Sequence, residues 1–208
     1  MPKKVGIIDY KLSNIYSVYQ ACKFVGLKPE LISKPSDFKS FDALIIPGVG
    51  SFPKAMENLK QQNLLDKIKE FAALNYPILG ICLGMQLLFT LSYEIKKCKG
   101  LNLIKGKVIK FDKKKLVVPH IGWNTFKTCK NGLKNNIFRN IPENSFMYFV
   151  HSYYVVPEDK KGIVALSKYG NQVFCSSYSK DNIYAMQFHP EKSSKQGIQI
   201  YKNFKQII

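Results

Sequence analysis

Arginine is almost absent from this chain, although the chain is strongly basic. Arg139 is the only arginine among 32 basic residues, and 14 acidic residues leave a formal net charge of +18 at pH 7. Arginine is the residue best suited to paired hydrogen bonds with bases and phosphates, so its scarcity argues against a nucleic-acid-binding protein. We interpret the lysines mainly as solvated surface, which leaves steering of anionic partners or substrates open.

Paired cysteines and long apolar runs are also lacking. The five cysteines are scattered, and no two of them form a C-x-x-C pair. This pattern argues against a disulfide scaffold and a zinc site, and it favours a reducing compartment. The first apolar run, residues 5–8, is too short for a signal-peptide core or a membrane span. We therefore expect a cytoplasmic protein with no metal, no cofactor and no membrane partner.

The order of apolar segments predicts an α/β fold. The length of 208 residues fits a single domain over residues 1–208. Strands are expected at 5–9, 28–32, 43–46 and 77–81, with helices at 14–25 and 52–74 and from 82 to about 91. This alternation predicts a parallel sheet with helices on both faces. Strand-like runs at 108–111, 116–118, 145–151, 153–156, 162–167, 173–178 and 183–188 predict antiparallel additions, and a last helix is expected at 195–206.

The most informative segment is residues 77–89, PILGICLGMQLLF. It reads as an apolar strand that turns into a helix, with Gly80 and Gly84 on either side of Cys82. Glycines at these positions permit a sharp turn that lifts the central side chain out of the fold, as in the Gly-x-Ser-x-Gly motif of hydrolases. The positive field at a helix N-terminus favours a thiolate. Cys82 is therefore a candidate nucleophile, and a buried structural cysteine is the alternative.

A candidate base for this thiol lies far downstream. His189 and Glu191 are two residues apart, so in an extended segment both side chains lie on one face. Pro190 between them suits the end or edge of a strand. Because a thiol nucleophile needs a base, and the base needs a group that holds its ring, we predict a Cys82–His189–Glu191 triad. A surface His-Pro-Glu turn is the alternative.

A glycine-containing loop follows the strand at 43–46. Ligands of open parallel sheets bind beyond the carboxyl ends of the strands, where Gly48, Val49 and Gly50 are expected. The two glycines allow backbone N–H groups to point at a ligand oxygen. Together with the N–H of Leu83, this loop is a candidate oxyanion hole. A plain glycine-proline turn is the alternative.

Together these segments resemble the class I, or triad, glutamine amidotransferases, and within them the glutaminase subunits of imidazole glycerol phosphate synthases. Residues 47–52, 80–88 and 187–193 look like the oxyanion strand, nucleophile elbow and base segment of those subunits. Residues 119–124, PHIGWN, and 148–154, YFVHSYY, are similar to the same subunits and are the more specific motifs. The chain departs from the family at residues 10–14, YKLSN, where a glycine-containing turn is common, and at 92–94, SYE, where Ser-Glu-Glu is usual.

The resemblance implies a flavodoxin-like fold and hydrolysis of glutamine to glutamate and ammonia by Cys82, His189 and Glu191. It further implies a heterodimer with a (β/α)₈ synthase subunit, which would use the ammonia to make imidazole glycerol phosphate and an aminoimidazole carboxamide ribonucleotide in histidine biosynthesis. The implied oxyanion and substrate-binding residues are Gly48, Val49, Gly50, Leu83, Gln86, Ser152 and Tyr153. The implied partner surface consists of His120, Trp123, Asn124, Tyr148 and Lys192, with core packing as the alternative for the two aromatics.

Two other functions remain open at the level of sequence. The same glutaminase chemistry could supply a synthase that acts on a surface-polysaccharide sugar. A catalytically inactive regulatory or scaffold subunit is a further alternative, against which the intact Cys82, His189 and Glu191 argue. Anthranilate-type and GMP-synthase-type glutaminases match residues 119–124 and 148–154 poorly.

Overall fold

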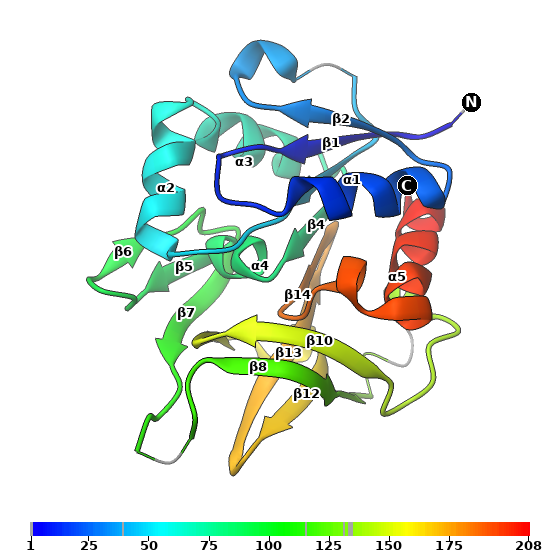
Figure 1. The fold of residues 1–208 in the computed structure, drawn as a ribbon. Helices are drawn as coiled ribbons and strands as arrows, with labels where there is room; N and C mark the ends of the chain where they lie inside the picture. The colour runs from blue at the N-terminus through cyan, green and yellow to red at the C-terminus, as the bar shows by residue number, and fades with distance from the viewer. Residues whose placement is uncertain (1, 39, 115, 131, 133–134) are drawn as a thin grey trace.

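The centre of the molecule is an eight-stranded sheet. The structure is a computed structural model that describes residues 2–38, 40–114, 116–130, 132 and 135–208. Its sheet has the strand order β2-β1-β3-β4-β14-β13-β12-β9 (Figure 1). The strands are β1 (Lys4–Ile8), β2 (Lys28–Ile32), β3 (Ala43–Ile46), β4 (Ile78–Ile81), β14 (Ile183–Met186), β13 (Gln172–Lys180), β12 (Ile163–Tyr169) and β9 (Lys127–Thr128). The first five strands in this order, β2, β1, β3, β4 and β14, pair in parallel with their neighbours. The remaining strands, β13, β12 and β9, continue the sheet from β14 in antiparallel pairs.

This topology confirms the predicted fold class. The parallel part follows the order 2-1-3-4-5 of flavodoxin-like folds, and the antiparallel additions come from the second half of the chain. Strands β3 and β4 are fully buried on both faces, as their continuous apolar sequences predict. Pro29 lies in β2 at the edge of the sheet, where its missing N–H leaves no gap in the ladder.

Helices cover both faces of the parallel part. On one face, α1 (Ile15–Phe24) and α5 (Ser194–Ile207) share an apolar core with β1, β3 and β4. On the other face, α2 (Phe52–Gln61), α3 (Leu65–Ala73) and α4 (Leu83–Leu87) form a second core against the same strands. Alternate residues of each strand supply the two cores, because successive strand side chains point to opposite faces.

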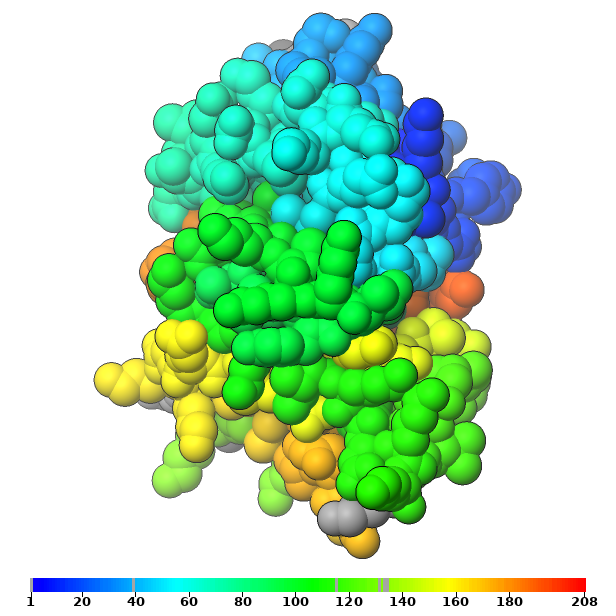
Figure 2. All heavy atoms as spheres, turned by 90° about the vertical axis from the view of Figure 1, so that its left-hand side faces the viewer, coloured from blue at the N-terminus to red at the C-terminus, as the bar shows by residue number. Residues whose placement is uncertain are grey.

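Two smaller sheets complete the molecule. One pairs β8 (His120–Thr125) with β10 (Phe146–His151), and the other has the order β11-β7-β5-β6, with β11 (Tyr153–Pro157), β7 (Ile104–Lys110), β5 (Phe89–Ser92) and β6 (Cys98–Lys99). In Figure 2, the side of the molecule that faces the viewer has α2 and α3 in cyan, with the segment of β5, β6 and β7 in green below them. Short 3₁₀ turns lie at Pro35–Asp37, Asn136–Phe138, Lys160–Gly162 and Pro190–Lys192 (η4).

Three predicted elements were wrong. The helix predicted over 52–74 is divided into α2 and α3, because Asn63 adopts a left-handed φ of 55° that an α-helix cannot continue through. The helix expected to reach about residue 91 ends at Leu87, since Phe89–Ser92 instead forms a strand that pairs with β7. Residues 116–118 form no strand, although their apolar sequence resembles one.

Candidate active site

Cys82 lies at the sharp junction between β4 and α4. Its backbone has φ 53° and ψ −108°, a combination that L-residues rarely adopt and that marks the strained turn of a nucleophile elbow. The Cys82 N–H donates to the carbonyl of Met186 at 2.8 Å, which ties the elbow to β14. Its side chain is only 5% exposed.

The glycines beside Cys82 are required by close packing. A Cβ at Gly84 would overlap the backbone carbonyl of Ile46 at the end of β3, and a Cβ at Gly80 would collide with Leu88 at the end of α4. The first turn of α4 therefore packs directly on the sheet. This contact holds the elbow in place, so the two glycines of the motif serve packing as well as the turn itself.

His189 and Glu191 are buried together beside the elbow. Strand β14 pairs in parallel with β4, so the segment that follows β14 leaves the sheet next to Cys82. The Nδ1 atom of His189 lies 2.8 Å from Oε1 of Glu191, and the two side chains are 2% and 1% exposed. The residues meet through the turn η4 rather than along an extended strand as expected, because Pro190 opens a 3₁₀ turn after His189.

The charge of His189 depends on its neighbours. Burial lowers the pKa of His189, but the Cys82 thiolate and the Glu191 carboxylate outweigh burial and raise this pKa to about 10. The Nε2 atom of His189 is buried and makes no hydrogen bond of ordinary geometry among the described residues, and Cys82 raises the pKa of His189 first through its charge and then as a hydrogen-bond acceptor. Sγ of Cys82 also lies 3.7 Å from the Val150 carbonyl oxygen and 3.6 Å from Nε2 of Gln187. The arrangement suits a thiolate–imidazolium pair.

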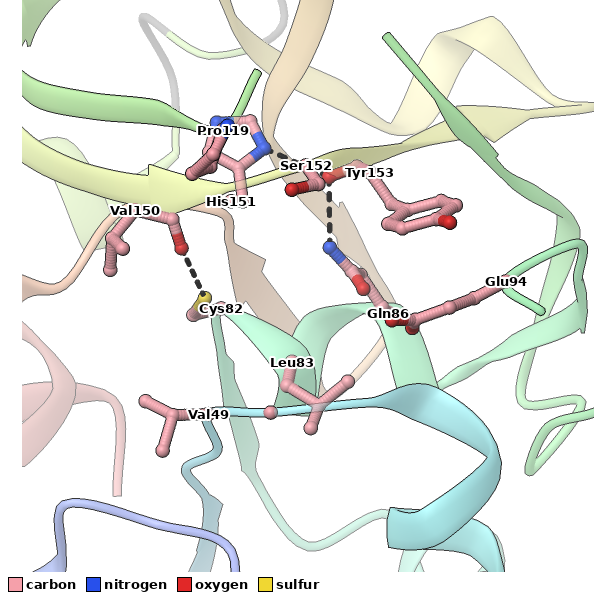
Figure 3. Close-up of a pocket in the computed structure, with 11 residues that line it drawn as sticks. Val49, Cys82, Leu83, Gln86, Glu94, Pro119, Val150, His151, Ser152 and Tyr153 are labelled. Carbon is pink, nitrogen blue, oxygen red and sulfur yellow. Dashed lines mark hydrogen bonds between the residues drawn. The ribbon is translucent and has the colours of Figure 1, made fainter.

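A pocket of about 220 Å³ opens over Cys82. It is lined by Val49, Gly50, Cys82, Leu83, Gln86, Glu94, Pro119, Val150, His151, Ser152 and Tyr153, most of which are labelled in Figure 3. Six of the seven predicted oxyanion and substrate-binding residues therefore surround this pocket. Gly48 does not line it: a Cβ there would meet the Tyr10 hydroxyl, and its carbonyl oxygen lies 3.4 Å from the N–H of Leu83.

Two N–H groups of the predicted oxyanion hole, those of Val49 and Leu83, already have acceptors. Val49 N–H donates to the carbonyl of Leu12 at 2.8 Å, and Leu83 N–H points at the carbonyl of Gly48 at 3.4 Å. Gly50 has φ 96°, a conformation that favours glycine. In this structure the Val49 N–H is therefore directed away from a ligand oxygen in the pocket.

The predicted partner residues divide between two faces of the β8–β10 ribbon. Trp123 is 53% exposed and lies edge-on to Tyr148, its paired residue on β10, at 6.0 Å between ring centroids. Nζ of Lys192 lies 5.9 Å above the Tyr148 ring. His120 is only 3% exposed on the inner face, and Asn124 is partly buried. Trp123 and Tyr148 thus lie on the outer face, where Lys192 of η4 reaches the Tyr148 ring, while strand alternation turns His120 inward.

Two polar residues at the site were missed from the sequence. Gln187 is fully buried and directs its Nε2 toward Cys82. Glu94 lines the pocket and accepts a hydrogen bond from the N–H of Phe52 at 2.8 Å, at the start of α2. Burial raises the pKa of Glu94. Glu94 is the only acidic residue between Glu70 and Asp112. This isolated carboxylate in a long basic and apolar stretch could have indicated a functional role from the sequence.

Neither a metal cluster nor a membrane helix is present in the described part of the chain. Within residues 2–38, 40–114, 116–130, 132 and 135–208, no three His, Cys, Asp or Glu side chains are grouped so that they could hold a metal ion. Over the same ranges, no helix has both the length and the apolar character needed to cross a bilayer.

Comparison with known proteins identifies the class. The family model "Glutamine amidotransferase class-I" matches residues 6–207. PurLQS from Thermotoga maritima has a similar fold, with a TM-score of 0.78 at 17% identity, covering 100% of this chain and 99% of that one. A glutamine amidotransferase from Thermotoga maritima gives a TM-score of 0.62 at 16% identity, covering 100% and 85%. The chain belongs to the class-I glutamine amidotransferases and is an enzyme of glutaminase type.

Sequence relatives narrow the family further. Imidazole glycerol phosphate synthase subunit HisH of Chlorobaculum tepidum is 42% identical over 200 residues, which cover 96% of this chain and 98% of the relative. The protein of the same name from Sulfurimonas denitrificans is 45% identical over 204 residues, covering 96% of each. Within the class, the chain therefore belongs to the family of HisH subunits.

Proposed function

We propose that this chain hydrolyses the side-chain amide of glutamine at Cys82 and passes the ammonia to a (β/α)₈ synthase subunit in histidine biosynthesis. The observation that carries the proposal is the strained elbow of Cys82 beside a histidine whose ring is held by Glu191 at 2.8 Å. The names of the HisH relatives support the histidine branch over a sugar acceptor. We place the reaction in the cytoplasm, in keeping with five free thiols, and assign it to a single domain.

The proposed reaction needs two half-reactions. The Cys82 thiolate attacks the amide carbon, and His189 gives a proton to the departing nitrogen, so that an S–C bond forms, the C–N bond breaks and ammonia leaves. Water then attacks the thioester, His189 takes its proton, and the S–C bond breaks to release glutamate. Glu191 keeps the His189 ring oriented through both steps and stabilises its positive charge.

The far end of the pocket suits the α-ammonium of glutamine. Both amide hydrogens of Gln86 are used, on the Tyr153 carbonyl and on Oε1 of Gln187, each at 3.0 Å. The Oε1 atom of Gln86 is therefore the acceptor left for a ligand, and the Glu94 carboxylate lines the same pocket. We assign both groups to binding the ammonium, with the backbone at Ser152 and Tyr153 completing the wall.

Activation is proposed to require a change in the oxyanion loop. Because Val49 N–H donates to Leu12, the free chain lacks one donor for the tetrahedral intermediate. An oxyanion donor contributes roughly 10²–10³ in kcat, so the chain alone should hydrolyse glutamine slowly. The synthase partner would bind the outer face at Trp123, Tyr148 and Lys192 and favour a rotated loop. Contact with the partner would also shield neutral ammonia from protonation in water.

Glutamate release tests the proposal directly. Cys82→Ala in the complex with the synthase subunit should abolish glutamine-dependent turnover, while turnover with added ammonium salts survives. Cys98→Ala serves as the matched control, because Cys98 lies on β6 outside the pocket lining, and it should retain wild-type activity. Glutamine hydrolysis by Cys82→Ala would show that the nucleophile is wrongly assigned.

A further inference from the structure

Two of the three histidines in the chain take no part in the proposed chemistry. His120 and His151 form a paired position of β8 and β10, and they are 3% and 6% exposed. Nδ1 of His120 lies 3.1 Å from Nε2 of His151, so the two rings are hydrogen-bonded directly. A buried pair of this kind needs a definite proton arrangement, because each ring nitrogen must either donate or accept.

The neighbours of the pair fix that arrangement. Nδ1 of His151 lies 2.8 Å from the Tyr153 carbonyl oxygen, which only accepts, so Nδ1 carries the proton and Nε2 accepts. Nδ1 of His120 must then donate to His151, and Nε2 of His120 accepts from the Asn124 amide at 3.3 Å. The same amide nitrogen of Asn124 donates to the carbonyl of Lys168 at 2.9 Å. All these contacts are satisfied only when both rings are neutral with the proton on Nδ1.

The surroundings keep the rings neutral and fixed. Burial lowers the pKa of His120 to about 4. Burial also lowers the pKa of His151 to about 3; the hydrogen bond to the Tyr153 carbonyl opposes this shift, and nearby His120 and His189 add to it. The His120 ring stacks on Phe149 and on Tyr169, with ring centroids 5.1 and 4.1 Å away.

The hydrogen bonds continue into the pocket. The Tyr153 carbonyl that accepts from His151 also accepts from Gln86, whose second amide hydrogen goes to Gln187. Gln187 in turn directs its Nε2 at Sγ of Cys82. Figure 3 shows His151, Tyr153 and Gln86 along one wall of the pocket, with dashed lines joining His151 and Gln86 to the same carbonyl.

We propose that His120 and His151 are positioning residues for the substrate pocket, which hold the Tyr153 carbonyl and through it the orientation of the Gln86 amide. The proposal rests on the proposed function, since it assigns these residues to glutamine binding. Their effect falls first on Gln86, which we assign to the α-ammonium of glutamine, whereas Cys82 lies one residue further along the chain of hydrogen bonds, beyond Gln187. Loss of the chain of hydrogen bonds should weaken binding of the ground state and the transition state alike, which raises KM and leaves kcat near wild type.

Three variants separate positioning from packing. His120→Leu fills the space of the ring without a donor and leaves Nε2 of His151 unsatisfied, so it should raise the KM for glutamine by about tenfold. His120→Asn retains an N–H donor near the position of Nδ1 and should restore most of the affinity. Phe174→Leu is the packing control. The centroid of the Phe174 ring lies 6.0 Å from that of His120 and 5.2 Å from that of His151, and Phe174 forms no hydrogen bond with either ring. It should lower the melting temperature without changing KM.

Glutamate release by the full chain with its synthase subunit gives these constants. A wild-type complex that releases no glutamate would contradict the proposed function itself. Where the wild type is active, an unchanged KM in His120→Leu, or equal impairment in His120→Asn, overturns the positioning role.

Nitrogen NMR of the imidazoles tests the same arrangement without any turnover. With only three histidines in the chain, single variants are enough to assign the signals. At neutral pH, His120 and His151 should both be neutral with the proton on Nδ1, whereas His189 should be protonated on both nitrogens. An Nε2–H tautomer at His120 or His151 would overturn the proposal.

Discussion

At the residue scale, the charge on His189 is set by the side chains around it rather than by exposure to water. Burial alone would make the ring neutral, and the Cys82 thiolate is the first of the influences that reverse this effect. Glu191 adds a hydrogen bond and a further negative charge. An ion pair of Cys82 and His189 would already hold the proton needed by the leaving nitrogen.

Removing either neighbour should weaken proton binding at His189. We expect Cys82→Ser to lower the pKa of His189 more than Glu191→Gln does. In Cys82→Ser, His189 should bind its proton about tenfold more weakly than in the wild type, or weaker still. An NMR titration of the His189 ring measures both values. A pKa that stays at about 10 in Cys82→Ser would contradict the ion-pair description.

The raised pKa of His189 also makes the free energy of unfolding depend on pH. The pKa of His189 is raised from 6.5 to about 10 on folding, so the protonated ring stabilises the folded chain fully below pH 6.5. That contribution is lost as pH rises through about 10. The free energy of unfolding of the wild type should therefore fall more steeply between neutral pH and about pH 10 than that of Cys82→Ser, as measured by urea titration.

At the element scale, the site depends on the direct packing of α4 against the carboxyl end of β3. Gly84→Ala should destabilise the protein by about 1–3 kcal/mol or more, because its Cβ would overlap the Ile46 carbonyl and force the helix away. Leu74→Ala is a suitable control, since Leu74 is 69% exposed at the end of α3 and should change stability by less than about 0.5 kcal/mol. Equal stabilities of Gly84→Ala and the wild type in urea would contradict this packing argument.

Elements with a continuous or regularly spaced apolar sequence could be predicted, but strands without that pattern could not. Strand β3 carries a continuous apolar run, and Cys82 lies between two glycines, so both were recognised locally. Strand β8 was missed because its inner positions, His120, Gly122 and Asn124, are not apolar and hide the usual alternation. The hydrogen bonds of Gln187 with Cys82 and of Val49 with Leu12 join residues that are distant in the sequence. The spacing of residues along the chain therefore could not predict them.

At the scale of the whole molecule, an exposed aromatic ribbon lies on a strongly basic protein. The outer face of β8 and β10 includes Ile121, Trp123 and Phe146, which are 60%, 53% and 60% exposed. Exposed apolar groups that gather on one ribbon mark an interaction surface. With a net charge of +18, association with an acidic partner should be faster at low ionic strength.

Trp123→Glu should therefore weaken binding of the synthase subunit by about tenfold or more, while the stability of the free chain changes little. Phe24→Glu on α1 is the matched control, since Phe24 is 75% exposed and lies outside this ribbon. Titration calorimetry of the two purified subunits measures both affinities. Equal affinities of Trp123→Glu and Phe24→Glu would show that the partner binds elsewhere.

The position of β14 in the sheet has a consequence for synthesis of the protein. During synthesis, Cys82 leaves the ribosome about a hundred residues before the segment 183–191. Until that segment emerges, β4 has no neighbouring strand on the side that β14 occupies in the folded protein. The nascent chain therefore carries an isolated cysteine and an open sheet edge, which favours association with other chains. The thiol meets its imidazole only when the last strand is inserted, so incomplete chains should leave the glutamine of the cell untouched.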